Sequence, residues 1–258
     1  MKYAGIVAWN TFREAVRDRV MYNLVFFALL MIGAAIVVGQ ISIGIEEIVI
    51  VSLGLSAISV IGLLMAVFIG VGLVYKEMDK RTLHALLAKP VQRWEFLLGK
   101  FGGLLLTLTV NTAAMAAGLF AAMLFVQHSL KRADLVVLIA VYFILLKLAI
   151  VVALALLFSC FTTPLLSILF TTGIYVAGIF VQQIRTFGKI TGSAALDAVA
   201  VWLSYLLPNF ENFNAIAAAT HRTAIPGALA GQNTLYAMLY CALVLAAAAV
   251  IFSRRNLK

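Results

Sequence analysis

The segment 76–100 holds the densest group of ionisable side chains in this chain of 258 residues, with six of the 19 basic and three of the 10 acidic residues. Leu83, Leu86 and Leu87 recur at intervals of three and four, so in a short helix they would share one face. Pro90 disfavours helical geometry at the residue before it, so such a helix would end there. The pattern predicts a short amphipathic helix presented at the protein surface. The alternative interpretation is an ordinary solvated loop.

A lysine, Lys147, interrupts an otherwise charge-free apolar run. A charged side chain at the centre of a bilayer costs at least about 2.5 kcal/mol, so it should face the protein interior and find a partner. Asn111 lies eleven residues after Lys100 in the preceding apolar run, at a similar depth. We expect Lys147 to pair with Asn111 or a backbone carbonyl, or to meet an anionic part of a substrate. Asn111 and Lys147 are therefore candidates for lining a pathway.

No other residues form a recognisable catalytic or metal-binding set. The three histidines are scattered over different polar segments, which does not suit a metal site. The two cysteines lack metal or redox spacing and are interpreted as packing residues. These five residues are His84, His128, His221, Cys160 and Cys241. The sequence thus predicts a protein that is not an enzyme and holds no cofactor or metal.

A nucleotide-binding loop is also missing. Gly99-Lys100 is followed by Phe101, and the position five before Gly99 is Trp94, where the phosphate-binding motif requires glycine. We therefore expect any energy source to reside on another chain.

The elements that carry these residues are membrane spans. Charged residues make up 11% of the chain, against about 25% in soluble domains, and the mean hydropathy is +1.10. The charge-free runs exceed the roughly 20 residues that a helix needs to cross a bilayer, whereas barrel strands alternate over about 10 residues. We expect an all-α integral membrane protein with one transmembrane domain over residues 1–258. The predicted spans are 22–44, 48–75, 101–126, 134–158, 164–183 and 233–252.

The basic residues set the expected orientation. Thirteen of the 19 lie in the segments before span one, between spans two and three, and after span six. Because basic residues collect on the cytoplasmic side, both termini and the segment 76–100 are expected in the cytoplasm. The net charge of +9 is explained by the same rule, without nucleic acid. Residues 1–21 should form an interfacial helix, and the outer loop 184–232 should contain another.

Glycines in two spans predict close contact between helices. They are Gly62, Gly70 and Gly72 in the second span and Gly99 and Gly103 at the start of the third. Packing within the chain is the first interpretation, and contact between two copies is the alternative.

The segment 76–100 resembles the loop between the second and third spans of permease subunits of type-2 ATP-binding-cassette exporters. The likeness covers nearly the whole chain, and it is closest to the bacterial permeases of nitrous-oxide-reductase maturation and gliding. The residues that carry it are Glu77, Arg81-Thr82-Leu83, Leu86-Leu87, Pro90-Val91-Gln92-Arg93 and Leu97-Leu98-Gly99-Lys100. Arg81 stands where many relatives have glycine.

This resemblance implies a permease in the bacterial plasma (inner) membrane, with a coupling helix that docks on a separate ATPase subunit. Two ATPase copies would hold the ATP and magnesium, and a homodimer of permeases would form the path through the lipid bilayer. The coupling residues would be Glu77, Arg81, Thr82, Leu83, Leu86, Leu87, Pro90 and Arg93. The alternative hypothesis is a membrane anchor or scaffold that recruits a partner without transport. Lipids, drugs, peptides, polysaccharides and metal–sulfur species all remain candidate substrates.

Overall fold

The protein is a bundle of long helices, seen here in a computed structural model that describes residues 2–42, 44–79, 93–127, 134–190 and 194–254. Nearly all of these residues are helical, and they contain no strand. The long helices are α2 (Arg19–Ile41), α3 (Glu46–Asp79), α5 (Arg93–Gln127), α6 (Leu135–Ser159) and α11 (Gly227–Arg254). Each is long and apolar enough to cross a membrane. The expectation of an all-α integral membrane protein is thus confirmed.

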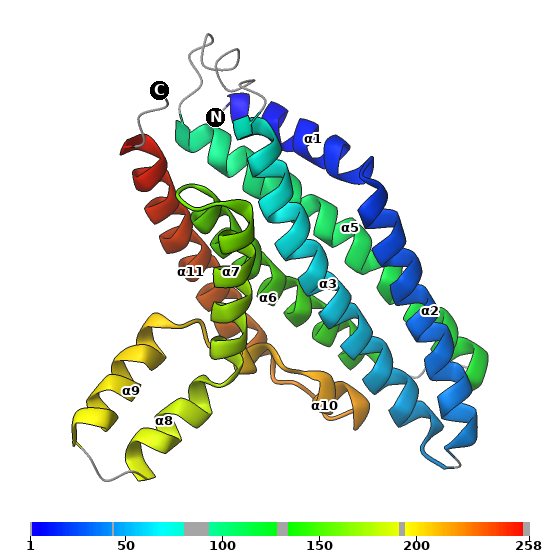
Figure 1. The fold of residues 1–258 in the computed structure, drawn as a ribbon. Helices are drawn as coiled ribbons and strands as arrows, with labels where there is room; N and C mark the ends of the chain where they lie inside the picture. Colours follow the sequence, from blue (N-terminus) through cyan, green and yellow to red (C-terminus); the bar gives the residue numbers. More distant parts are fainter. Residues whose placement is uncertain (1, 43, 80–92, 128–133, 191–193, 255–258) are drawn as a thin grey trace.

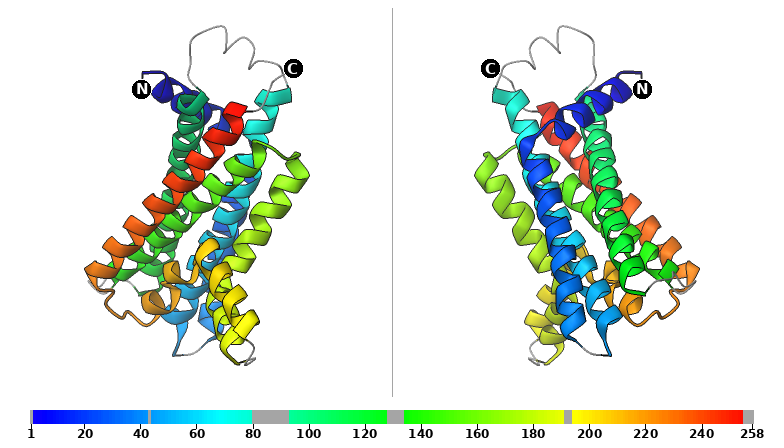
Figure 2. Two further views of the ribbon diagram at one scale, coloured as in Figure 1. Left: turned by 90° about the vertical axis from the view of Figure 1, so that its left-hand side faces the viewer. Right: turned by 90° about the vertical axis from the view of Figure 1, so that its right-hand side faces the viewer.

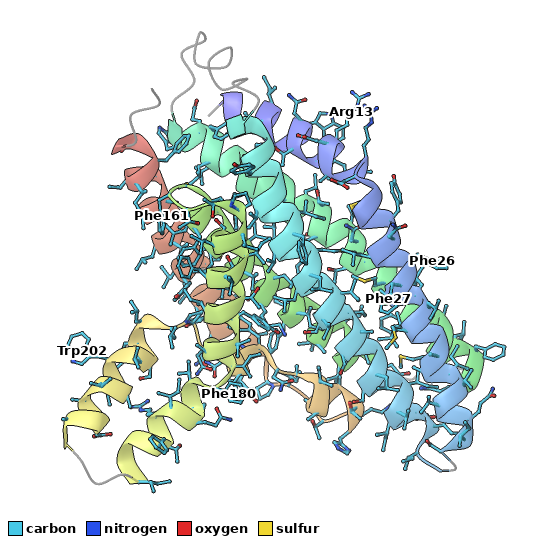
Figure 3. The ribbon with its side chains drawn as sticks, viewed as in Figure 1. Arg13, Phe26, Phe27, Phe161, Phe180 and Trp202 are labelled. Carbon is cyan, nitrogen blue, oxygen red and sulfur yellow. The ribbon has the colours of Figure 1, made fainter. Side chains whose placement is uncertain are left out.

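Both ends of the described chain lie at the same end of the bundle (Figure 1), which we call the proximal end. The opposite end, where α2 meets α3 and α5 approaches α6, is called the distal end. The views from the two sides show α1 (Lys2–Val16) lying across the proximal end at an angle to the spans (Figure 2). Phe26 projects from α2 away from the bundle (Figure 3), and both Phe26 and Phe27 are exposed. In a bilayer, such apolar side chains face lipid or another chain.

Helix α6 is the most buried span and contacts α3, α5, α7 and α11. Its neighbour α3 approaches closely because of glycine. A Cβ atom added at Gly62 would lie 2.6 Å from Leu148 Cδ1, and one at Gly70 would lie 3.2 Å from the Cβ of Ala155. By contrast, a Cβ at Gly72 would meet nothing within 4 Å. Two of the three glycines predicted to allow close packing in this span therefore do so within the chain.

The fifth span differs from the prediction of one helix over 164–183. Helix α7 (Pro164–Ile179) ends after 16 residues, and the chain bends by 60° into α8 (Val181–Ile190). The bend coincides with a change in the sequence pattern. The apolar run gives way to an amphipathic helix, α8, which carries Gln182, Gln183 and Arg185. Such a helix prefers an interface to the hydrocarbon core. The described part of the chain thus has five long spans, or six if the bent pair counts as one.

A hairpin of α8 and α9 (Ala194–Leu206) extends away from the bundle beyond the end of α7 (Figure 1). The two helices mainly contact each other, and α8 makes only a small contact with α7. Aromatic side chains stay exposed on the hairpin, among them Trp202, with 77% of its surface accessible. The chain then returns through the 3-10 turn η2 (Glu211–Phe213) and the short helix α10 (Ile216–Thr220), which packs on α3 and α6.

Candidate functional site

The centre of the bundle contains a buried lysine with partners on two other helices. Lys147, on α6, is 9% exposed, and its Nζ atom donates a hydrogen bond of 2.7 Å to Oγ of Ser59 on α3. The same Nζ lies 5.7 Å from the ring centroid of Tyr175 on α7, within range of a cation–π interaction. The carboxylate of Glu211 in η2 also acts on it electrostatically. These contacts offset part of the cost of removing an ammonium group from water.

An ammonium group has three N–H donors, and Lys147 uses one of them in a hydrogen bond within the described part of the chain. The structure gives no hydrogen bond between Lys147 and Asn111, the partner that the sequence suggested; the serine takes that place. Asn111 is itself buried on α5, 5% exposed, and its Nδ2 has no hydrogen-bond partner among the described residues. Both candidate pathway residues are therefore buried polar groups with unused hydrogen-bonding capacity.

A cavity of about 580 Å³ opens at the distal end, next to the same face of α6. Amide side chains and Tyr236 line it together with Phe143, which precedes Lys147 by four residues and so lies one helical turn from it. Phe143 meets Phe213 edge-on, with ring centroids 6.5 Å apart. Aromatic rings therefore lie at the side of the cavity that is nearest in sequence to the lysine on α6.

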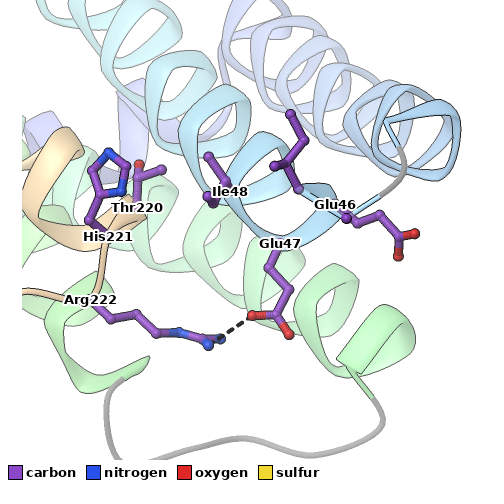
Figure 4. Close-up of a pocket in the computed structure, with 8 residues that line it drawn as sticks. Glu46, Glu47, Ile48, Thr220, His221 and Arg222 are labelled. Atoms are coloured by element: carbon purple, nitrogen blue, oxygen red, sulfur yellow. Dashed lines mark ion pairs between the residues drawn. The ribbon is translucent and has the colours of Figure 1, made fainter.

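A second polar cluster lies at the distal end around Arg222, in the turn after α10. Its Nη1 atom is 2.8 Å from Oε2 of Glu47, and its Nη2 is 3.0 Å from Oδ1 of Asp134. Nη2 also donates a hydrogen bond of 3.2 Å to Oε1 of Gln127. A hollow of about 500 Å³ lies between this turn and the start of α3. Figure 4 shows Arg222 reaching across it to Glu47, with His221 beside the arginine.

At the proximal end, α1 packs along the first turns of α5. A Cβ atom added at Gly99 would lie 2.6 Å from Cβ of Val7, and one at Gly103 would lie 2.5 Å from the carbonyl oxygen of Ala8. No residue but glycine fits these two positions without displacing α1. The predicted glycine pair of the third span therefore serves packing within the chain.

Comparison with known proteins fits this architecture. The family model described as ABC-2 family transporter protein matches residues 6–257. The chain belongs to the ABC-2 family. No curated protein sequence matches it.

As an ABC-2 protein, the chain is the transmembrane permease component of an ATP-binding cassette transporter. It is a multi-pass membrane protein and a transport component that is not itself catalytic, and permeases of this family work with an ATP-binding cassette ATPase. The polar groups described above are therefore to be judged by how they serve transport.

The residues expected to couple the ABC-2 permease to its ATPase fall mostly outside the described part of the chain. Glu77 lies in the last turn of α3 and Arg93 begins α5, but their side chains are not described. The others are outside the described residues: Arg81, Thr82, Leu83, Leu86, Leu87 and Pro90. The described helices show that α3 ends and α5 begins at the proximal end (Figure 1).

Sequence reasoning missed the partners that the ABC-2 fold assembles. Ser59 and Tyr175 stand in apolar runs without a local pattern that links them to Lys147. Glu47 and Arg222 are separated by most of the chain, and only their common position at span ends hinted that they could meet. A search for polar residues near the same end of different spans would have found Glu47 and Arg222.

Proposed function

We propose that this permease is the membrane part of an exporter, driven by a separate ATPase subunit that docks on the segment 76–100. The proximal end would then face the cytoplasm. Three features support this: the basic residues collect in segments at this end, the segment joins two spans there, and the family works with ATPases. The likeness to the nitrous-oxide-reductase maturation and gliding permeases belongs to the same proposal.

The observation that carries the proposal is the packing of α1 on the start of α5. Helix α5 begins at Arg93, inside the proposed docking segment 76–100, and continues without a break for 35 residues. A helix of that length extends about 52 Å, enough to cross the bilayer. Since Gly99 and Gly103 hold α1 against its first turns, a displacement of the docking segment would move α1 and α5 together. The pair would transmit movement from the ATPase into the bundle.

Lys147 is proposed to meet an anionic group of the substrate. Its ammonium group keeps unused donors in the middle of the bundle, and the distal cavity begins one helical turn away. A mid-membrane cation attracts an anion strongly because little water screens it. Asn111 would add a neutral hydrogen-bonding group to the same path.

Two copies of the permease are proposed to associate, each with its own ATPase subunit that holds ATP and magnesium, in the bacterial plasma membrane. The described residues of one chain supply at most six spans, and closed symmetric dimers are the commonest oligomers. Crosslinking in native membranes should therefore give a dimer band.

The test is co-purification of the permease with the ATPase encoded beside it, with ATP hydrolysis measured in lipid nanodiscs. Wild type should bind and alter hydrolysis. Glu77→Ala and the double variant Leu86→Asp, Leu87→Asp should insert normally but lose both effects. The matched control is Glu14→Ala, which removes an exposed acid from α1 at the same end.

The proposal fails if all of these variants bind the ATPase and change its hydrolysis as wild type does. If the ATPase binds but no substrate ever moves, the chain is an anchor that recruits the ATPase rather than a transport path.

A further inference from the structure

We propose that Arg222 is a positioning residue whose ion pairs hold α10 against α3 and α6 and so latch the distal end closed at rest. The name distal latch is used below for Arg222 with Glu47, Gln127 and Asp134. That substrate would leave the permease at the distal end rests on the proposed function. That Arg222 holds the distal end closed does not depend on the proposed function.

The guanidinium group ties together the ends of several helices. Glu47 is at the start of α3, Gln127 is the last residue of α5, and Asp134 is the N-cap of α6. Arg222 itself lies between α10 and α11. Arginine suits such a junction because its planar fork offers five donors in fixed directions. One side chain thus links the ends of α3, α5 and α6 to the turn after α10.

The backbone at Arg222 supports a specific role for this side chain. Its φ of 53° makes it the only non-glycine residue with positive φ in the described part of the chain. Helices commonly end on a left-handed residue, which is usually glycine. Here that turn is closed by Thr223 N donating to the Ala218 carbonyl at 2.9 Å. An arginine at this position carries a conformational cost, and its side chain is thereby directed at the ends of α3, α5 and α6.

The latch is built to release as well as to hold. The Glu47 and Arg222 side chains are 39% and 25% exposed, so water and salt can reach this pair. Partly exposed ion pairs are weak and are screened by salt. Asp134 is buried, but it occupies the N-cap position of α6, where the partial positive charge of the helix N-terminus favours its carboxylate after the arginine leaves.

The latch also lies at the distal ends of α3 and α5, the two helices that flank the proposed ATPase-docking segment. Helices α3 and α5 flank the proposed docking segment at their proximal ends, and Arg222 holds both of them at their distal ends through Glu47 and Gln127. A relative movement of α3 and α5 at the proximal end would therefore strain these contacts directly. No intermediate chain of side chains is needed for this coupling.

The experiment uses the full-length permease in nanodiscs, with Cys160 and Cys241 replaced by alanine. The reporter is Ala219→Cys on α10, a position that is 1% exposed. The rate of its reaction with a membrane-impermeant thiol reagent is measured. The parent should react slowly. Arg222→Gln should react about tenfold faster, because it removes two ion pairs and the hydrogen bond to Gln127. Glu47→Gln removes one ion pair and should lie between the parent and Arg222→Gln.

Raising the salt concentration should speed labelling of the parent, because the Glu47 pair is partly exposed. The matched control is Arg185→Gln, which removes an exposed arginine from α8 without touching the latch. It should leave the rate unchanged. Equal rates in the parent, Arg222→Gln and Glu47→Gln would overturn the proposal. If Arg222→Gln does not fold, Glu47→Gln and the salt series decide in the same way.

The last arm adds the ATPase and ATP. Faster labelling of the parent during ATP hydrolysis is the expected result. Hydrolysis with labelling at the resting rate would make Arg222 a permanent brace and refute the latch. If the ATPase does not bind at all, the proposed function fails, while the resting comparison still decides whether Arg222 holds the distal end closed.

Discussion

Gly102 and Gly103 offer a matched pair of substitutions that tests the attachment of α1. A Cβ atom at Gly103 would lie 2.5 Å from the Ala8 carbonyl oxygen and 2.6 Å from Cβ of Thr11, whereas one at Gly102 would lie 3.7 Å from Cβ of Ala8. Both changes to alanine gain about 1 kcal/mol of helix propensity. That gain cancels in the comparison, so the difference between the variants reports the steric overlap alone.

The overlap at Gly103 involves backbone and a Cβ atom, which cannot rotate away as the tip of a long side chain can. Overpacking of this kind costs about 1–3 kcal/mol. If α1 relieves it by separating from α5, its opening equilibrium shifts by roughly 5- to 140-fold, since 1.4 kcal/mol is a factor of ten. Amide hydrogen exchange of α1, followed by mass spectrometry in nanodiscs, should be faster by that factor in Gly103→Ala than in Gly102→Ala.

Equal exchange in the two variants would refute the reasoning, because α1 would then not depend on close contact at Gly103. Faster exchange throughout the bundle would also count against it, since the prediction is local to α1. If α1 loosens as expected, coupling to the ATPase should weaken in the same variant.

Three further outcomes can be measured in lipid nanodiscs. Ser59→Ala should lower the melting temperature, because it removes a hydrogen bond to a charged group worth about 1.5–3 kcal/mol; Lys147→Met should not, because it removes the buried charge as well. Gly178→Ala should cost about 1–3 kcal/mol, since its Cβ would lie 2.5 Å from the Pro208 carbonyl oxygen, while Gly173→Ala, with nothing within 4 Å, should not destabilise the fold. Fluorescence of a variant whose only tryptophan is Trp202 should be quenched by lipids brominated near the headgroups and less by those brominated deep in the chain, as expected at an interface.

The long spans could be predicted from the sequence because their physics is local. Uninterrupted apolar runs decide which segments can cross a bilayer, and five of the six predicted runs appear as long helices at nearly the expected places. The fifth appears as the bent pair of α7 and α8, because hydropathy extends the run to Gln183, whereas the amphipathic pattern that begins at Val181 turns the chain aside. The apolar run and the amphipathic pattern overlap there, and tertiary contacts decide at which residue the chain turns.

The candidate site was less predictable. The sequence identified Lys147 as a residue in need of a partner, because the cost of burying its charge is a general property. It could not identify the partner, since Ser59 lies 88 residues away and the pairing depends on how α3 packs on α6. The same holds for Arg222 and Glu47. Energetic need can be predicted from composition, but the residue that meets it depends on the packing of distant helices.

The short helix α7 has a consequence for the surrounding membrane. Its 16 residues extend about 24 Å, less than the hydrocarbon thickness of a typical bilayer, about 30 Å. The other spans are longer, so the bilayer beside α7 must thin locally, or the amphipathic α8 must enter the part of the lipid acyl chains nearest the headgroups. This mismatch lies on one side of the bundle only. It favours short-chain lipids there, and it would draw together two chains that share the thinned patch.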